Sequence, residues 1–136
     1  MIRKLHKDDY NLLSEWIDND PYHKGLITPE FWYSIFSVVV SDDLGPVGFI
    51  ALWPDPPYMR VNIQFCSNPK RVAASFTQGF DEVGQLCLSA GAKGILFTTE
   101  SPKVAAFCIK RYGFERVKDT NDYLLPIQAK VLEANV

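Results

Sequence analysis

The sequence predicts an α/β domain in which a mixed sheet carries helices on both faces. Three segments carry this prediction. Residues 59–66 alternate apolar and polar side chains, which is typical of a half-buried strand. Residues 72–87 place apolar side chains at helical spacing, and residues 92–115 have the pattern of a strand, a helix and a further strand. An antiparallel meander followed by such a strand–helix–strand crossover forms a mixed sheet.

Length and composition are those of an ordinary globular protein. The chain has 136 residues, of which 47% are hydrophobic and 22% charged, enough to form a core without disulfides or metals. The net charge of −2 argues against nucleic acid or an anionic membrane as a partner, although a local basic patch can still bind an anionic cofactor. We expect a single domain over residues 1–127 and a loose tail over residues 128–136.

The cysteines and the N-terminal residues indicate the compartment. Cys66, Cys87 and Cys108 are odd in number and lie among apolar neighbours, as buried thiols do in a reducing compartment. The first residues lack the apolar run of a signal peptide, and no stretch reaches membrane-spanning length, so a cytoplasmic protein is expected. His23 lies in a turn and is expected to be solvated, and no metal site is expected from the residue spacing.

The N-terminal segment is expected to supply a strand followed by two helices. Residues 2–6 alternate as in a first strand, and Asp8 or Asp9 can cap the first helix. Thr28 and Pro29 suit the cap and the first position of a second, aromatic helix. The apolar faces of the two helices are expected to be Tyr10, Leu13, Trp16 and Ile17 in the first, and Phe31, Trp32, Ile35 and Phe36 in the second.

A meander and a long helix follow. Strands are expected over residues 37–41, 47–53 and 59–66, because glycine and proline turns separate them. After Pro69 a long helix is expected, although Gly79 and Gly84 each weaken it by about 1 kcal/mol relative to alanine. Its core face should consist of Val72, Phe76, Phe80, Val83 and Cys87.

The last part of the chain has the pattern of the crossover. A strand over residues 92–99 leads to a helix that Pro102 can begin and Gly113 can end in a left-handed conformation. Strands from Phe114 and over residues 123–127 complete the sheet. The expected order of elements is therefore β-α-α-β-β-β-α-β-α-β-β.

The helix and strand that end the crossover resemble those of GNAT-type acetyltransferases. The pattern of that family is Asn-x-x-Ala, a tyrosine four residues on, and then Gly-Phe. Ala105, Gly113 and Phe114 match it, whereas Pro102 and Ile109 stand at the asparagine and tyrosine positions. The order of elements also matches over nearly the whole chain. In the family this tyrosine commonly protonates the departing CoA thiolate, so the resemblance assigns no catalytic acid here and the catalytic residues stay unknown.

The resemblance implies that acetyl-CoA, as a co-substrate, binds where the third meander strand leads into the long helix. The family signature there is Gln/Arg-x-x-Gly-x-Gly/Ala. One register puts Arg71 at the basic position, with Ala74 and Phe76 at the glycine positions. A register shifted by one puts Ser75 and Thr77 at the glycine positions instead. Both registers stay open, and neither contains a glycine.

Basic residues at the start of this helix favour a nearby anion, because the N-terminal end of a helix dipole disfavours cations. The alternative is an ordinary helix start with two solvated basic side chains. Under the first interpretation the resemblance implies cofactor contacts from Phe65, Cys66, Ser67, Lys70, Arg71, Val72, Ala73, Ala74 and Ser75.

The same resemblance implies an acceptor site near the turn after the second meander strand. Trp53, Asp55 and Tyr58 are the expected substrate residues, and a rigid proline turn with a packed aromatic is the alternative. In the family a glutamate or a water chain on the third meander strand is often the general base. The polar side chains of that strand include no carboxylate and are Arg60, Asn62, Gln64 and Cys66.

The sequence thus predicts a diverged acyl-CoA-dependent N-acetyltransferase that acts on a small-molecule or protein amine. A homodimer or a larger assembly is an open alternative to a monomer. The alternative function is a catalytically silent GNAT-like module for binding or structure. The absent glycines, Ile109 and the aromatic segment at residues 31–36 favour this alternative.

Overall fold

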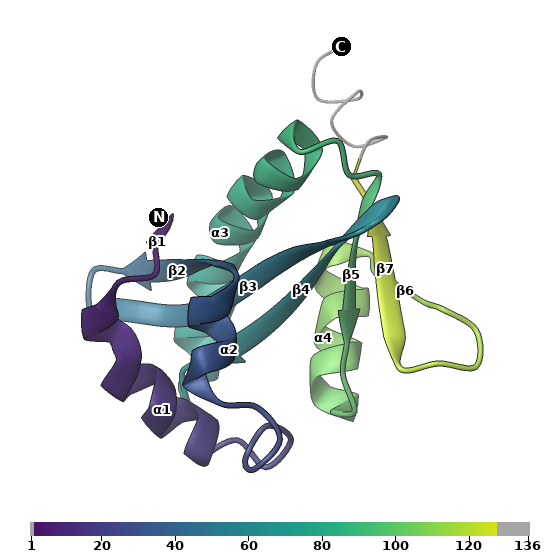
Figure 1. The fold of residues 1–136 in the computed structure, drawn as a ribbon. Coiled ribbons are helices and arrows are strands. Elements are labelled where there is room, and N and C mark those ends of the chain that lie inside the picture. Colours follow the sequence, from purple (N-terminus) through teal and green to yellow (C-terminus); the bar gives the residue numbers. More distant parts are fainter. Residues whose placement is uncertain (1, 128–136) are drawn as a thin grey trace. The chain divides into compact units, whose positions relative to one another are not determined.

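The computed structural model describes residues 2–127, in two compact units (Figure 1). Unit 1 comprises the residues up to Leu52 and Asn62–Val83, and unit 2 comprises Trp53–Val61 and the residues from Gly84 onward. The tail expected over residues 128–136 lies outside the described residues. The single domain expected over residues 1–127 stays a prediction.

The order of the elements is the one that the sequence predicts, with a short 3-10 helix, η1 (Lys7–Asp9), before the first α-helix. The strands form a seven-stranded mixed sheet of order β1-β2-β3-β4-β5-β7-β6. The strands are β1 (Ile2–Lys4), β2 (Phe36–Asp42), β3 (Gly45–Asp55), β4 (Tyr58–Phe65), β5 (Gly94–Thr98), β6 (Glu115–Arg116) and β7 (Asp122–Pro126). The α-helices are α1 (Tyr10–Asp18), α2 (Pro29–Ser34), α3 (Pro69–Ser89) and α4 (Pro102–Tyr112). None of the helices within residues 2–127 is long and apolar enough to span a membrane.

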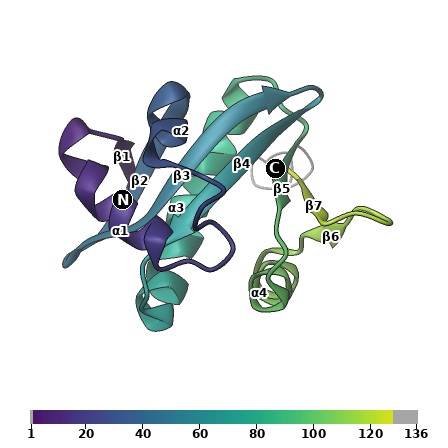
Figure 2. The ribbon, with the colours of Figure 1, turned by 60° about the horizontal axis from the view of Figure 1, so that its bottom comes forward.

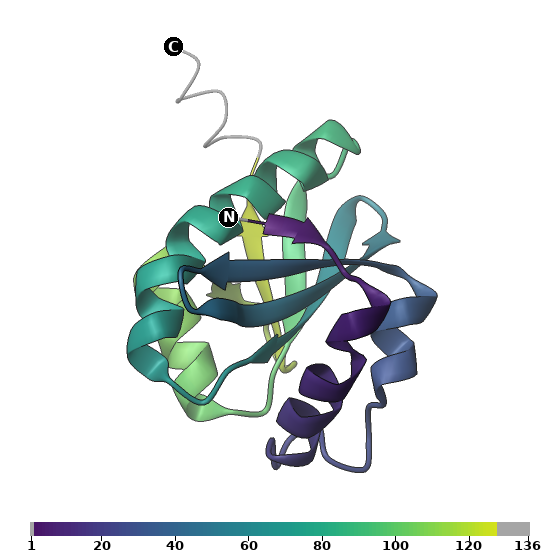
Figure 3. The same cartoon turned by 90° about the vertical axis from the view of Figure 1, so that its left-hand side faces the viewer.

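In unit 1, helices cover both faces of the strands (Figure 3). Successive side chains of a strand point to opposite faces. The ring of Phe49 on β3 lies 5.1 Å from that of Trp16 on α1. Its neighbour Gly48 faces Phe76 of α3. The sheet of unit 1 therefore has an α1 face and an α3 face.

Two glycines allow α3 to approach the α3 face closely. A Cβ atom on Gly48 would lie 2.7 Å from Cε2 of Phe76, and one on Gly79 would lie 2.8 Å from Cγ1 of Val40. Real Cβ atoms essentially never approach other atoms this closely. The sequence predicts that Gly79 weakens the helix, and the structure adds that its missing side chain is what lets the helix contact β2.

The start of α1 differs from the sequence-based expectation. Neither Asp8 nor Asp9 caps α1 with its side chain; η1 precedes it, and His6 is the N-cap of η1. Asp9 instead accepts from the backbone N–H of His6 at 2.8 Å and from Nη1 and Nη2 of Arg3 at 2.9 and 2.8 Å. The hydrogen bonds from Arg3 lower the pKa of Asp9. Its carboxylate thus ties β1 to η1.

The aromatic helix is shorter than predicted. α2 ends at Ser34, and Phe36 is the first residue of β2, with 46% of its surface exposed. Thr28 stands at the N-cap but makes no capping hydrogen bond with its side chain, while Pro29 lies in the first turn as predicted. Trp32 is the fully buried anchor of this helix. Its indole fixes α2 in unit 1 without Phe36.

In unit 2 a short stretch of β4 pairs in parallel with β5, and β5 pairs antiparallel with β7. Figure 2 shows α4 on one side of β5, β6 and β7. The core contains Phe97 of β5, whose ring contacts Phe114 edge-on at 5.0 Å and stacks on Tyr123 at 5.4 Å. Aromatic contacts of this kind add to the burial of apolar surface.

Both ends of α4 are fixed by the local sequence. Ser101 accepts a hydrogen bond from the N–H of Val104 at 3.3 Å, and Pro102 occupies the first turn. Gly113 ends the helix with φ 80°, in the left-handed region that favours glycine. The predicted proline start and glycine end of this helix are confirmed.

Candidate functional site

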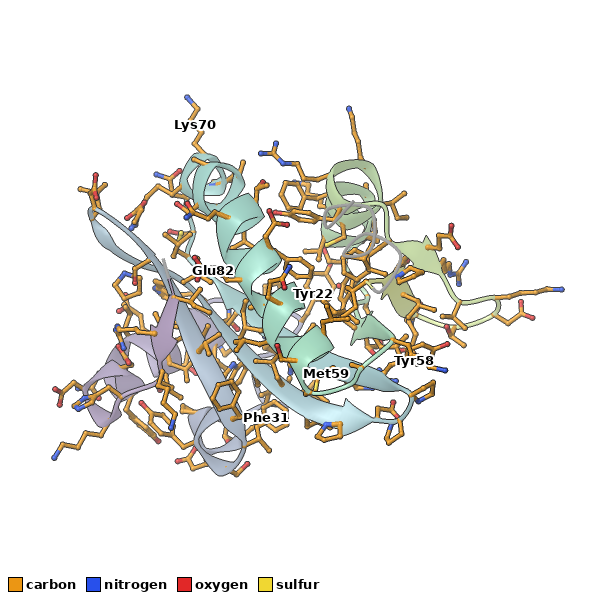
Figure 4. The ribbon with its side chains drawn as sticks, turned by 90° about the horizontal axis from the view of Figure 1, so that it is seen from above. Tyr22, Phe31, Tyr58, Met59, Lys70 and Glu82 are labelled. Atoms are coloured by element: carbon orange, nitrogen blue, oxygen red, sulfur yellow. The ribbon has the colours of Figure 1, made fainter. Side chains whose placement is uncertain are left out.

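The residues expected to contact acetyl-CoA lie in unit 1, at the end of β4 and in the first turns of α3 (Figure 4). The ring of Phe65 lies 4.9 Å from that of Phe76 on α3. The next residue, Cys66, donates its backbone N–H to the carbonyl oxygen of Val47 at 2.8 Å. These contacts fix the reversal from strand to helix.

Asn68 occupies the N-terminal end of α3, where an anion would bind. Its Oδ1 accepts from the backbone N–H groups of Lys70 at 3.1 Å and Arg71 at 3.3 Å. Its carbonyl oxygen accepts from Val72 N–H at 3.2 Å. The N–H groups of Lys70 and Arg71 are among the donors that the first turn of a helix leaves without intrahelical partners, whereas the bond from Val72 is the first intrahelical one. A phosphate at this point would therefore have to displace the Asn68 side chain.

Arg71 is paired with a carboxylate inside unit 1. Its Nε and Nη2 bind the two carboxylate oxygens of Asp42 at 2.8 and 2.7 Å, and Nη2 also donates to the carbonyl oxygens of Gly45 and Pro46. The hydrogen bonds from Arg71 lower the pKa of Asp42 to about 2. Arg71 thus fastens α3 to the turn between β2 and β3, and a phosphate would have to share it with Asp42.

Lys70 is the basic side chain of this helix start that stays available. It is exposed and points outward from the N-terminal end of α3 (Figure 4). Among the described residues, no hydrogen bond or ion pair involves its ammonium group. It therefore has the freedom that an anion contact requires.

Ala74 and Ser75 face a different environment. They line a shallow hollow of about 310 Å³, together with Ser41, Asp42, Asp43 and Gln78. Carboxylates at the rim repel a phosphate, because like charges disfavour each other at short range. The cofactor contacts predicted for Ala74 and Ser75 stay predictions, and this hollow does not favour them.

The three predicted substrate residues lie in unit 2, at the ends of β3 and β4. Asp55 accepts from Nε of Arg60 at 3.2 Å and from Nη2 at 3.0 Å. Tyr58 packs on Gly94, because a Cβ on that glycine would lie 3.3 Å from the tyrosine Cδ1. Trp53 is half-buried on β3. Asp55 and Tyr58 thus have structural contacts, and their role in acceptor binding stays a prediction.

Arg60 is the centre of a polar network in unit 2. Besides Asp55, it binds Oδ1 of Asp122 at 3.1 Å and the hydroxyl of Thr98 at 2.9 Å. These hydrogen bonds lower the pKa of Asp122 and raise that of Arg60. The network joins β3, β4, β5 and β7 at one end of unit 2.

Cys108 and Tyr112 are the residues of α4 that carry an ionisable thiol or hydroxyl near the position of the family tyrosine. Cys108 is buried, and desolvation raises the pKa of its thiol to about 12, so the predicted core role of this residue is confirmed. Ile109 has 45% of its surface exposed. The ring of Tyr112 contacts that of Phe107 edge-on at 5.8 Å.

A hydrogen-bonded cluster in unit 1 was missed by the sequence analysis. Nδ1 of His23, in the loop between α1 and α2, lies 2.6 Å from Oε1 of Gln64 on β4. Nε2 of Gln64 donates to Oδ2 of Asp20 at 3.3 Å. The prediction that His23 is solvated is wrong, since only 17% of its side chain is exposed. Among residues 2–127, no group of three or more His, Cys, Asp or Glu residues is arranged to hold a metal ion.

Gln64 also differs from its expected environment. The alternation along β4 predicts an outward polar side chain, but only 3% of Gln64 is exposed. Its partner His23 lies 41 residues earlier in the chain. The alternation of side chains along a strand carries no information about a contact with a residue so far away in the sequence. The sequence hints at a buried partner only by placing the polar side chain of Gln64 in a strand.

Solved structures share this architecture. An acetyltransferase of the GNAT family from Staphylococcus aureus Mu50 is 15% identical, with a TM-score of 0.74, over 94% of this chain and 99% of that one. A GNAT family acetyltransferase from Brucella melitensis, in complex with acetyl-CoA, is 16% identical, with a TM-score of 0.63, over 93% of this chain and 86% of that one. Naa20 from Chaetomium thermophilum, in complex with a bisubstrate analogue, is 16% identical, with a TM-score of 0.67, over 100% of this chain and 91% of that one.

No protein-family model matches the sequence, and the comparison with curated proteins gave no match either. The likeness is therefore one of structure at low sequence identity. It extends over almost the full length of this chain and of its structural neighbours, and it includes the mixed sheet with its helices. This chain has the GNAT acetyltransferase fold.

Proposed function

We propose that this protein is a diverged acyl-CoA-dependent N-acetyltransferase, which transfers an acetyl group to the amine of a small molecule or protein. The observation that carries the proposal is the fold, because structural neighbours over most of its length include a GNAT acetyltransferase in complex with acetyl-CoA. Fold alone does not specify function. The proposal therefore also rests on the chemistry of the start of α3.

The start of α3 fits an anionic group in two respects. An oxygen of Asn68 already accepts two backbone N–H groups there, so the donors converge on one point. The ammonium group of Lys70 lies on the same turn and points outward (Figure 4). In this proposal the pyrophosphate of the co-substrate takes the place of the Asn68 oxygen, and Lys70 neutralises part of its charge.

The proposed acetyl transfer does not require a proton donor on α4. Bound acetyl-CoA would supply an activated thioester, and the protein would contribute mainly the alignment of the amine against it. A free thiol ordinarily has a pKa near 8.5, so a thiolate is a tolerable leaving group near neutral pH. Ile109 in place of a tyrosine is compatible with this mechanism.

The proposal is tested by CoA binding. A ligand that binds the native state alone adds to the free energy of unfolding, by about 2.7 kcal/mol at a ligand concentration of a hundred times Kd. It thereby raises the melting temperature. CoA should therefore raise Tm, and Lys70→Ala should weaken binding about fivefold, as expected for the loss of about 1 kcal/mol from one exposed charge contact. Lys118→Ala, which removes an exposed lysine from a turn of unit 2, is the matched control and should leave Kd unchanged.

Pantetheine, which lacks the pyrophosphate, sharpens the test. Its affinity should be the same for the wild type and Lys70→Ala, because the proposed lysine contact is absent from this ligand. No change in Tm at millimolar CoA would contradict the proposal. That result would favour the alternative, a catalytically silent module, which the pairing of Arg71 with Asp42 also supports.

A further inference from the structure

The imidazole of His23 is held in a fixed position within unit 1. Its Nδ1 lies 2.6 Å from Oε1 of Gln64 and 3.4 Å from Oδ2 of Asp20, and its ring meets that of Trp32 edge-on at 6.2 Å. The backbone of the loop is ordered by its own hydrogen bonds. His23 N–H donates to the carbonyl of Asp20 at 3.1 Å, and Ile27 N–H donates to that of His23 at 3.0 Å.

The partners of the ring determine which nitrogen carries the proton. A carboxylate can only accept, so the side-chain amide of Gln64 must direct its nitrogen to Asp20, at 3.3 Å. The amide oxygen then faces His23 and needs a donor there. Nδ1 must therefore carry the hydrogen, and in the neutral ring the lone pair is on Nε2.

Nε2 is the nitrogen left for chemistry. Within residues 2–127, all hydrogen bonds and ion pairs of this ring involve Nδ1. The side chain keeps 17% of its surface exposed. A base whose second nitrogen is oriented by an acceptor, which is in turn oriented by a carboxylate, is the arrangement that activates nucleophiles in many enzymes.

The cluster lies on the strand that leads to the proposed cofactor contacts. Phe65 contacts Phe76 of α3, so its neighbour Gln64 points to the opposite face of β4, where it meets His23. Gln64 directly precedes Phe65 and Cys66, the first of the proposed contacts. The imidazole is therefore placed beside the end of the strand at which the proposed cofactor contacts begin.

We propose that His23 is the general base of the acetyl transfer and that Gln64 and Asp20 are residues that position it. This inference rests on the proposed function. Nε2 takes a proton from the ammonium group of the acceptor, which gives a free amine. The amine nitrogen forms a bond to the thioester carbonyl carbon, and the C–S bond breaks with its electron pair leaving on sulfur. The second proton lost by the nitrogen passes to that sulfur and gives the free thiol of CoA.

The tautomer can be measured without any substrate. The chain has two histidines, so His6→Asn leaves His23 as the one source of imidazole signals. His6 caps η1, and asparagine is also a preferred cap, so the fold should persist. Nitrogen-15 NMR of this variant should show Nδ1 protonated and Nε2 unprotonated in the neutral ring. Adding Gln64→Leu should mix the two tautomers, and a ring protonated mainly at Nε2 in the His6→Asn variant would overturn the proposal.

The base role is tested by kinetics with acetyl-CoA and two acceptors, spermidine and a peptide with a free N-terminal amine. His23→Ala should lower kcat/KM about 100-fold or more, the range of general-base catalysis, while the CoA affinity stays unchanged. In His23→Ala, the fall in rate toward acidic pH should disappear together with the imidazole. Of the groups that contact the ring, Asp20 is ionisable, whereas Gln64 and Trp32 are neutral. His6→Asn should keep the wild-type rate.

Added imidazole separates a base from a structural residue. It should restore the rate of His23→Ala in proportion to its concentration, which a purely structural role does not predict. Full activity of His23→Ala with an unchanged pH profile would overturn this inference while leaving the proposed function intact. Failure of the wild type to bind CoA, in contrast, would remove the proposed function itself and with it the role of His23.

Discussion

The polar cluster around Arg60 in unit 2 and the one around His23 in unit 1 differ in whether every hydrogen-bonding group of the central side chain has a partner. In unit 2, all three nitrogens of the Arg60 guanidinium donate, and they bind Asp55, Asp122 and Thr98. In unit 1, the His23 cluster satisfies Nδ1 and leaves Nε2, and the start of α3 leaves the ammonium group of Lys70. We call a network closed when all donors and acceptors of its central side chain are bonded within the protein, and such a network stabilises the fold. An open network keeps a donor or acceptor that can bind a ligand. From this comparison we expect ligand binding in unit 1.

The strongest way to break this comparison is to remove the centre of the closed network. Arg60→Ala leaves Asp55 and Asp122 without their guanidinium partner, and side-chain exposure at Arg60 is only 22%. We expect a loss of about 2 kcal/mol in the free energy of unfolding, the order of magnitude for charged hydrogen bonds. Urea denaturation measures it, and the Kd for CoA should not change. A loss of CoA affinity with little loss of stability would show that this network is functional.

A matched pair of glycines tests the closeness of α3 to the sheet of unit 1. In Gly79→Ala the new Cβ would meet Val40 at 2.8 Å, whereas at Gly84 it would find nothing within 4 Å. Overpacking typically costs 1–3 kcal/mol, and alanine regains about 1 kcal/mol of helix propensity. We expect Gly79→Ala to destabilise by about 1 kcal/mol and Gly84→Ala to stabilise by a similar amount. Equal effects of both substitutions in thermal unfolding would contradict this packing.

Asn68→Ala tests whether the helix start is available to an anion. The variant loses the side-chain cap of α3, which typically costs about 1 kcal/mol, and it frees the N–H groups of Lys70 and Arg71. Stability should therefore fall in the absence of ligand, while the affinity for CoA should rise. Calorimetric titration measures the affinity, and Ser101→Ala at α4 is the control that loses a cap without any change in CoA binding.

The smallest expected effect is a pH dependence from Asp42. Its pKa is about 2 in the folded protein and about 3.9 when unfolded, so its pairing stabilises the fold fully above pH 4. That contribution is lost as the pH falls from about 4 to about 2. Asp42→Asn should therefore lower Tm at neutral pH and flatten the acid dependence of Tm in this window. An unchanged acid profile would show that the ion pair with Arg71 does not form.

The fold could be predicted because its signals are local. Pro102 and Gly113 mark the ends of α4 within one helix, and apolar spacing from Phe76 to Cys87 marks the buried face of α3. Caps and periodicity act over a few residues, which a single sequence displays. The order of elements followed from such signals.

The site could be predicted only in part, because its contacts are distant in sequence. Lys70 and Arg71 mark the start of α3 as a basic position, but the pairing of Arg71 with Asp42 joins residues 29 apart. The contact between His23 and Gln64 joins residues 41 apart. Such pairs depend on how the strands and loops meet, and neither propensity nor periodicity encodes that. The capping role of Asn68 could have been predicted from the sequence, because asparagine directly before a helix is a common N-cap.

The most direct test of the open site in unit 1 is a titration of the protein with CoA followed by backbone amide NMR. If the pyrophosphate displaces Oδ1 of Asn68, the amide signals of Lys70 and Arg71 should shift most. The amide of Val104, which Ser101 caps in α4, should barely move. Saturable shifts at the start of α3 are the predicted result. Shifts that are absent there, or that occur equally at both helix starts, would contradict the account.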